Sequence, residues 1–71
     1  MTNTEPIIRL DQFMKVVGLV STGGQAKLVI QGGEVEVNGF IETRRKKKLK
    51  QGDTVTFNGE TFVVEFEEPA A

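Results

Sequence analysis

The chain has 71 residues, of which 38% are hydrophobic and 27% are charged, and its formal net charge at pH 7 is −1. This length allows one domain with a thin hydrophobic core. The sequence contains no cysteine and no histidine, which excludes disulfide bonds and thiolate metal sites and removes the most common general base and metal ligand.

The two ends of the chain differ from the rest in composition. Residues 1–6 are mostly polar and end in proline, which predicts a flexible arm, and residues 67–71 are typical of a frayed acidic tail. The domain is therefore expected to span residues 7–66. The start lacks the basic and apolar stretches of a signal peptide, and no apolar run approaches the about 20 residues of a membrane-spanning helix. We expect a cytoplasmic location.

A first helix is predicted from Leu10, because the apolar residues at positions 10, 13, 14 and 17 follow helical spacing. Asp11 near its start complements the helix dipole and, like Lys15, is expected on the exposed face. Gly18 weakens the pattern, so the helix should end by Val20.

A second helix is predicted to begin with a capping box, in which Thr22 and Gln25 satisfy N–H groups reciprocally. Gly32 and Gly33 should end it. The two glycines before Gln25 would let a phosphate oxygen approach the free N–H groups of the helix start, and Lys27 would add a cation. Taken alone, however, the segment is better interpreted as an ordinary cap that stabilises a short helix.

Two Asn-Gly pairs between alternating apolar residues predict two β-hairpins with type I′ turns, at positions 38–39 and 58–59. A two-residue turn places Val55 opposite Phe62. Residues 52–53 should form the turn that leads into the second hairpin. The order of elements predicts an α+β domain, in which two N-terminal helices pack on a small antiparallel sheet of two hairpins.

Residues 44–50, called the basic run below, hold six of the nine basic residues, whereas the rest of the chain sets three basic residues against ten acidic ones. Such close cations repel one another unless solvent or an anionic partner offsets the repulsion. A solvated loop is the alternative, but we favour anion binding, and nucleic acid is the usual polyanion. Arg44 and Arg45 would grip phosphates bidentately, and Leu49 should anchor the run to the core.

Phe40 follows the first hairpin turn and has two interpretations of equal weight. Its ring would either pack in the core with Val37 or stack on an unpaired base. The other four phenylalanines are expected in the core. Asn38 is needed for the turn conformation, with a base contact as the lesser alternative.

No catalytic constellation is evident. The acidic residues are scattered among strands, turns and the tail, and a site without histidine or cysteine would depend on serine, lysine and carboxylates alone. We therefore expect no enzyme activity and no catalytic residues, no metal, no cofactor and no small-molecule substrate.

Several stretches of the chain match parts of one known RNA-binding domain. Residues 10–27 resemble its two-helix start, residues 30–39 look like its helix end, strand and Val-Asn-Gly turn, and residues 43–45 and 49–53 are similar to its basic loop and Gly-Asp turn. The chain thus resembles the αL RNA-binding motif of the ribosomal protein S-four-like family over residues 8–66. It looks most similar to the small stand-alone bacterial YbcJ type, which implies a non-catalytic binder of structured RNA.

The resemblance places the RNA surface on the start of the second helix, the first hairpin turn and the basic run. In many members an arginine follows the serine that begins the second helix, whereas this chain has Thr22, so that contact is not carried over. Glu34, Glu36 and Glu42 would repel phosphate and narrow the surface. The residues expected to bind RNA are Ser21, Thr22, Gly23, Gly24, Gln25, Lys27, Asn38, Phe40, Arg44, Arg45, Lys46, Lys47, Lys48 and Lys50.

The sequence therefore predicts a protein that binds structured RNA of the ribosomal or transfer class through a basic loop and a helix N-terminus. The ribosome or its assembly intermediates would be its partners, and no membrane contact is expected. The alternative is a protein-interaction adaptor that docks an acidic protein surface through the same loop. Because both modes are electrostatic, salt dependence separates them only in part.

Overall fold

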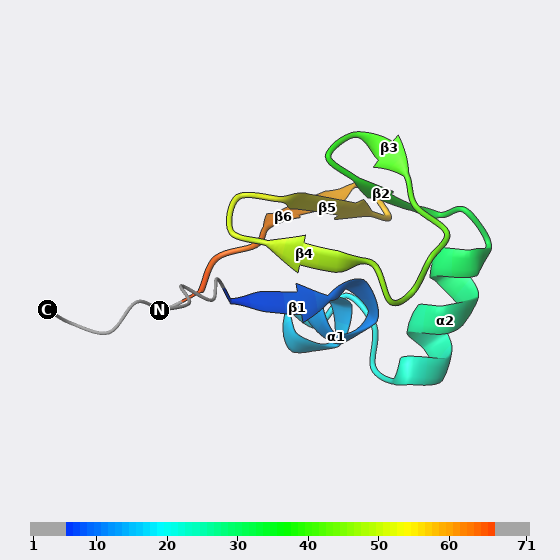
Figure 1. The fold of residues 1–71 in the computed structure, drawn as a ribbon. Helices are drawn as coiled ribbons and strands as arrows, with labels where there is room; N and C mark the ends of the chain where they lie inside the picture. The colour runs from blue at the N-terminus through cyan, green and yellow to red at the C-terminus, as the bar shows by residue number, and fades with distance from the viewer. Residues whose placement is uncertain (1–5, 67–71) are drawn as a thin grey trace, which may run out of the picture.

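The computed structural model describes residues 6–66, and the predicted α+β fold is confirmed there (Figure 1). Most of the predicted N-terminal arm and the whole acidic tail lie outside these residues, so both stay predictions. The elements of the described part are β1 (Ile7–Arg9), α1 (Leu10–Val16), α2 (Gly23–Gln31), β2 (Val35–Val37), β3 (Phe40–Ile41), β4 (Lys48–Lys50), β5 (Thr54–Phe57) and β6 (Glu60–Val63).

Both predicted hairpins form, and their turns have the expected geometry. Asn38 and Asn58 have φ values of 53° and 54°, and the glycines that follow them have φ values of 86° and 80°. A type I′ turn needs positive φ at both central residues, which asparagine and glycine tolerate best. The predicted pairing of Val55 with Phe62 is also confirmed.

The two hairpins join into one four-stranded antiparallel sheet in the order β3-β2-β5-β6. The contact between them is the pairing of β2 with β5, in which Val37 lies opposite Val55. Because side chains alternate along a strand, Val35 and Val37 are buried on one face while Glu36 between them is exposed on the other. The sheet therefore has an inner face on the core and an outer face in solvent.

A second sheet was not predicted from the sequence. The last part of the basic run, expected to be a connection, is strand β4, which pairs antiparallel with β1 and sets Leu49 opposite Ile8. Both strands have three residues, which are too few for an alternating pattern to be recognised in the sequence. In Figure 1 this small sheet lies in front of the four-stranded sheet, with α1 beneath it.

The first helix differs from its prediction at one position. Asp11, expected on the exposed face, is only 6% exposed. The segment before β4 crosses the start of α1, where the N–H groups of Leu10 and Asp11 donate to the carbonyl oxygens of Lys47 and Arg45 at 2.8 and 3.1 Å. The helix ends at Val16, within the predicted limit, before Gly18 with φ 81°.

The core lies between the helices and the inner faces of both sheets. The phenylalanines other than Phe40 pack in or against it, as predicted. No helix among residues 6–66 has the length and apolar character needed to cross a membrane. The buried apolar side chains are Leu10, Phe13, Met14, Val20, Ala26, Ile30, Val35, Val37, Leu49, Val55 and Val64.

Candidate nucleic-acid interface

The basic run is held to the protein by one side chain and by its backbone. Leu49 is fully buried, which confirms its predicted role as an anchor, while Lys48 and Lys50 on either side of it are exposed. This alternation follows from strand geometry, since neighbouring residues of β4 point to opposite faces. The last two lysines of the run therefore stand on a strand, while the four cations before them lie on a segment whose backbone is hydrogen-bonded to the start of α1.

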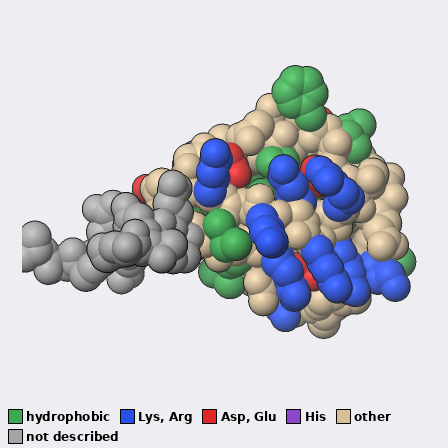
Figure 2. Space-filling model, in the orientation of Figure 1, with side chains coloured by type: hydrophobic (Ala, Val, Ile, Leu, Met, Phe, Trp, Pro, Cys, Tyr) green, Lys and Arg blue, Asp and Glu red, His purple; other side chains and the backbone are tan. Residues whose placement is uncertain are grey.

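The cations of this run gather on one side of the molecule. Figure 2 shows Lys and Arg side chains spread over β4, the segment before it and the neighbouring ends of the helices. Among residues 6–66, the ion pairs are those of Arg9 with Asp11 and Arg44 with Glu42. The remaining cations of the run thus have no carboxylate partner in that part of the chain, and their charge is available to an external anion.

Arg44 differs from the other cations because Glu42 holds it. The Glu42 carboxylate accepts from the Nε and Nη2 atoms of Arg44 at 2.9 and 3.3 Å and from its backbone N–H at 3.0 Å. The hydrogen bond from the Arg44 side chain lowers the pKa of Glu42, and the same bond raises the pKa of Arg44. The guanidinium is therefore fixed in orientation and partly neutralised, with only some of its donors left for a ligand.

The predicted cap of the second helix is present in a shifted form. Thr22 is the N-cap residue, and its Oγ1 accepts from the Gln25 N–H at 3.1 Å. The Gln25 Oε1 accepts from the N–H of Ser21 at 3.0 Å and not from that of Thr22. Gly23 and Gly24 begin the helix, and their N–H groups have no acceptor among residues 6–66.

Neither of these two glycines is required by the packing of the protein. A Cβ at Gly23 would have no neighbour within 4 Å, and one at Gly24 would lie 3.9 Å from the Thr22 Oγ1. Neither has a positive φ. Because glycine is less favourable than alanine in a helix, the fold alone does not explain the pair.

Asn38 uses its side chain inside the protein. Its Nδ2 donates to Asp53 Oδ1 at 3.2 Å, and its Oδ1 accepts from the Thr54 N–H at 2.9 Å. Asp53 in turn accepts from the backbone N–H of Lys50 at 2.9 Å, and this hydrogen bond is the main cause of its lowered pKa. Asn38 thus ties the first hairpin turn to the turn that follows the basic run.

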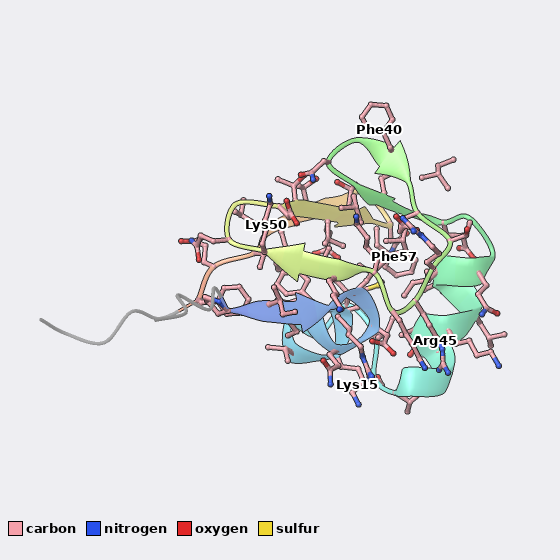
Figure 3. All side chains as sticks on the ribbon, in the orientation of Figure 1. Lys15, Phe40, Arg45, Lys50 and Phe57 are labelled. Atoms are coloured by element: carbon pink, nitrogen blue, oxygen red, sulfur yellow. The ribbon has the colours of Figure 1, made fainter. Side chains whose placement is uncertain are left out.

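Phe40 is not in the core, so of its two equally weighted interpretations the one that packs the ring in the core with Val37 is wrong. It lies opposite Val37 on the inner side of the sheet, yet it is 78% exposed. The reason is its place on β3, the edge strand, beyond the area that the helices cover. Figure 3 shows the ring extending from β3 away from the body of the protein.

Lys15 on α1 is exposed, as predicted, but the sequence analysis did not include it among the RNA-binding residues. In the view of Figure 3 it lies below Arg45, on the side of the molecule that carries the basic run. The hydrogen bond from the Asp11 N–H to the Arg45 carbonyl oxygen brings the run against this helix. No sequence signal marks that backbone contact, so the position of Lys15 beside the basic run could not be predicted.

The predicted surface is therefore brought together in part. The basic run and the start of α2 are both visible on the side of the molecule drawn in Figures 2 and 3. Asn38 supports the hairpin that carries Phe40. Glu36 lies on the outer face of the sheet, opposite to the face that packs on the core. The described residues enclose no pocket, so the candidate interface is an open surface.

Comparison with known proteins identifies the family of this chain. A family model described as "S4 domain" matches residues 1–65. The chain belongs to the S4 domain family. The family was predicted from the motif residues, and the match extends over nearly the whole chain.

Two curated relatives are similar over most of their length. The chain is 39% identical over 59 residues to "Putative RNA-binding protein YbcJ" of Escherichia coli (strain K12), which covers 83% of this chain and 84% of the relative. It is 40% identical over 53 residues to "Probable ribosome maturation protein RlbA" of Bacillus subtilis (strain 168), which covers 75% of each chain.

One solved structure supports the fold directly. The solution structure of YbcJ from E. coli matches with a TM-score of 0.62 at 33% identity, over 89% of this chain and 78% of that one. That structure is described as revealing an αL motif involved in RNA binding. The S4 domain assignment and the αL architecture therefore agree between sequence and structure.

Proposed function

We propose that this protein binds structured RNA of the ribosomal or transfer class, without catalysis, in the cytoplasm. The observation that carries the proposal is the set of exposed lysines held on β4 around the buried Leu49. Because β4 holds the backbone of these lysines in place, their charges meet closely spaced phosphates together. The relatives named for RNA binding and for ribosome maturation support RNA, and ribosome assembly intermediates, as the partner.

The surface would work by two kinds of phosphate contact. Lys46, Lys48 and Lys50 act as mobile point charges, whereas Arg45 offers the planar fork of donors that matches a phosphate. Recognition then rests on the shape and backbone of folded RNA, as is usual for paired RNA. Lys15 and Lys27 extend the positively charged surface along the two helices.

The start of α2 would bind one further phosphate. The N–H groups of Gly23 and Gly24 have no acceptor among residues 6–66, and the helix dipole favours an anion there. The absent arginine of other family members is compensated, in this proposal, by Lys27 and Arg45. Asn38 is assigned a positioning role and not a base contact, because its amide is already bonded to Asp53 and Thr54.

An adaptor that docks an acidic protein is the rival function. It would use the same lysines, and a carboxylate of the partner would fit the free N–H groups of the helix start as a phosphate does, so competition between the two ligands is needed to separate the functions. The expected outcome for an RNA binder is that excess structured RNA displaces any bound acidic protein. If RNA fails to displace such a partner and binds no better than to a charge-reversed surface, the proposed function is wrong.

The test uses a charge swap that leaves the net charge unchanged. Lys46→Glu and Lys48→Glu remove two exposed cations of the run, and Glu60→Lys and Glu65→Lys restore the net charge at exposed positions outside it. The swapped protein should bind a structured RNA more weakly, and its log–log salt slope should fall by about 0.7–0.9 for each phosphate that the protein no longer binds. Binding equal to that of the unmodified chain would show that only net charge matters.

A further inference from the structure

The ring of Phe40 is a large apolar surface that the fold leaves in solvent. It is 78% exposed, more than any other large apolar residue among residues 6–66. Its strand, β3, is the edge of the four-stranded sheet, so no further strand covers it. In the orientation shared by Figures 2 and 3, it stands at the border of the side that carries the basic residues.

The hairpin that carries this ring is fixed on both sides. Before the ring, the Asn38 side chain is bonded to Asp53 and Thr54. After it, the Glu42 N–H donates to the Val35 carbonyl oxygen at 2.9 Å, and the Glu42 carboxylate holds Arg44. The exposed aromatic thus sits on a rigid support, and little conformational freedom of the backbone is lost when a ligand contacts it.

The chemistry around the ring favours a nucleotide over an apolar partner. Ile41, the neighbouring exposed apolar residue, lies opposite Glu36 and so belongs to the outer face of the sheet. The inner side therefore presents one isolated flat ring, too small for the hydrophobic centre of a protein interface. Arg44 follows four residues later, within about 14 Å of extended chain, so one strand of RNA can contact both.

We propose that Phe40 is a stacking platform for an unpaired base of the bound RNA. The ligand is then a structured RNA in which an unpaired nucleotide adjoins the paired segment whose phosphates contact the basic run. The donors of Arg44 that Glu42 leaves free hold a phosphate next to that nucleotide. Stacking of a base on an aromatic ring tolerates all four bases, so the contact selects RNA shape and not sequence. This inference rests on the proposed function.

The experiment compares two RNA hairpins that differ by one bulged nucleotide. Binding of the full chain is measured for the bulged hairpin, in which the bulge carries the fluorescent base 2-aminopurine, and for the fully paired hairpin. Phe40→Ala should weaken binding of the bulged RNA by about 5- to 150-fold and abolish the fluorescence quenching by the ring. The affinity for the paired RNA and both salt slopes should stay unchanged.

Three further variants serve as controls. Phe40→Trp keeps a stacking surface and should keep the preference for the bulged RNA, whereas Phe40→Leu keeps apolar area without a ring and should lose it. Val63→Ala, which truncates an exposed apolar residue at the opposite edge of the sheet, should change nothing. Because these side chains are exposed, we expect the variants to fold, which circular dichroism verifies.

The possible failures are distinguishable. If the unmodified chain binds both hairpins equally, or if Phe40→Ala weakens both equally or neither, the stacking platform is wrong while RNA binding stands. Retention of the preference by Phe40→Leu would equally overturn it. If the unmodified chain binds neither hairpin, the proposed function fails, and the inference falls with it.

Discussion

Glu42 binds Arg44 through three hydrogen bonds, of 2.9, 3.0 and 3.3 Å, at the start of the basic run. Glu42 is one of three carboxylates that the sequence marks as repulsive to phosphate, yet its side chain is only 13% exposed and it faces the arginine. It therefore acts less as a barrier than as an internal counter-ion. One cation of the run is oriented and partly neutralised, while its neighbours remain free for an external anion.

Replacement of Glu42 by glutamine should strengthen RNA binding. The substitution removes a negative charge from the surface and releases the full charge of Arg44. We therefore expect about 2- to 10-fold higher affinity for RNA, and a steeper log–log salt slope that corresponds to up to about one additional bound phosphate. Filter binding of a structured RNA over a salt series measures both. Glu60→Gln, which removes the same charge from an exposed position on β6, is the control, and an equal gain there would contradict the account.

The same carboxylates should make stability depend on pH in the acidic range. Hydrogen bonds from Arg44 to Glu42 and from the Lys50 N–H to Asp53 lower both pKa values below the ordinary values of 4.5 and 3.8. A lowered folded-state pKa adds stability that is present above the unfolded-state pKa and is lost as pH falls through the folded-state pKa.

Urea denaturation between about pH 6 and about pH 3 measures this effect. The free energy of unfolding should begin to fall near the ordinary pKa of 4.5 and continue to fall below that of 3.8. The double variant Glu42→Gln with Asp53→Asn should be less stable at neutral pH and should show a shallower decline. An identical decline in both proteins would assign the acid sensitivity to other carboxylates.

Leu49 should be the residue on which the whole basic surface depends for its position. Its side chain is fully buried between two exposed lysines. Leu49→Ala should lower the free energy of unfolding by about 2–5 kcal/mol, because it removes buried methyl groups and leaves a cavity. Ile7→Ala on the paired strand, where the side chain is 55% exposed, should cost far less. Equal destabilisation in a urea titration would contradict the assigned anchor.

Gly23 and Gly24 should lower the stability of α2 and favour the binding of a phosphate at its start. Alanine at both positions has room in the fold and should stabilise the protein by up to about 1 kcal/mol per residue, because alanine is the better helix former. The added methyl groups should nevertheless weaken RNA binding by blocking approach to the N–H groups. Gln31→Ala at the exposed far end of α2 is the control. A stabilised double variant with unchanged RNA affinity would refute the predicted phosphate contact.

The parts of the fold that could be predicted are those with strong local signals. The turns at Asn38 and Asn58 follow from the positive φ that type I′ geometry needs, and the cap at Thr22 follows from its hydroxyl. The sheet between β1 and β4 could not be predicted, because each strand has three residues and its partner lies about 40 residues away in the sequence.

The candidate site follows the same division. The charge of the basic run is visible in the composition, and so are the glycines of α2. The burial of Asp11, the position of Lys15 and the exposure of Phe40 depend on which elements lie over one another. Phe40 shows most clearly what the sequence does not reveal. Its pairing with Val37 is compatible with either a buried or an exposed ring, and the edge position of β3 decides between them.

The most direct test of RNA binding is cross-linking in cells followed by sequencing of the attached RNA. The unmodified chain should recover a defined set of structured RNAs, enriched in ribosomal or transfer RNA. The variant that swaps Lys46 and Lys48 with Glu60 and Glu65 should fail to recover that set at the same net charge. Recovery of background RNA alone, unchanged by the swap, would contradict the proposal.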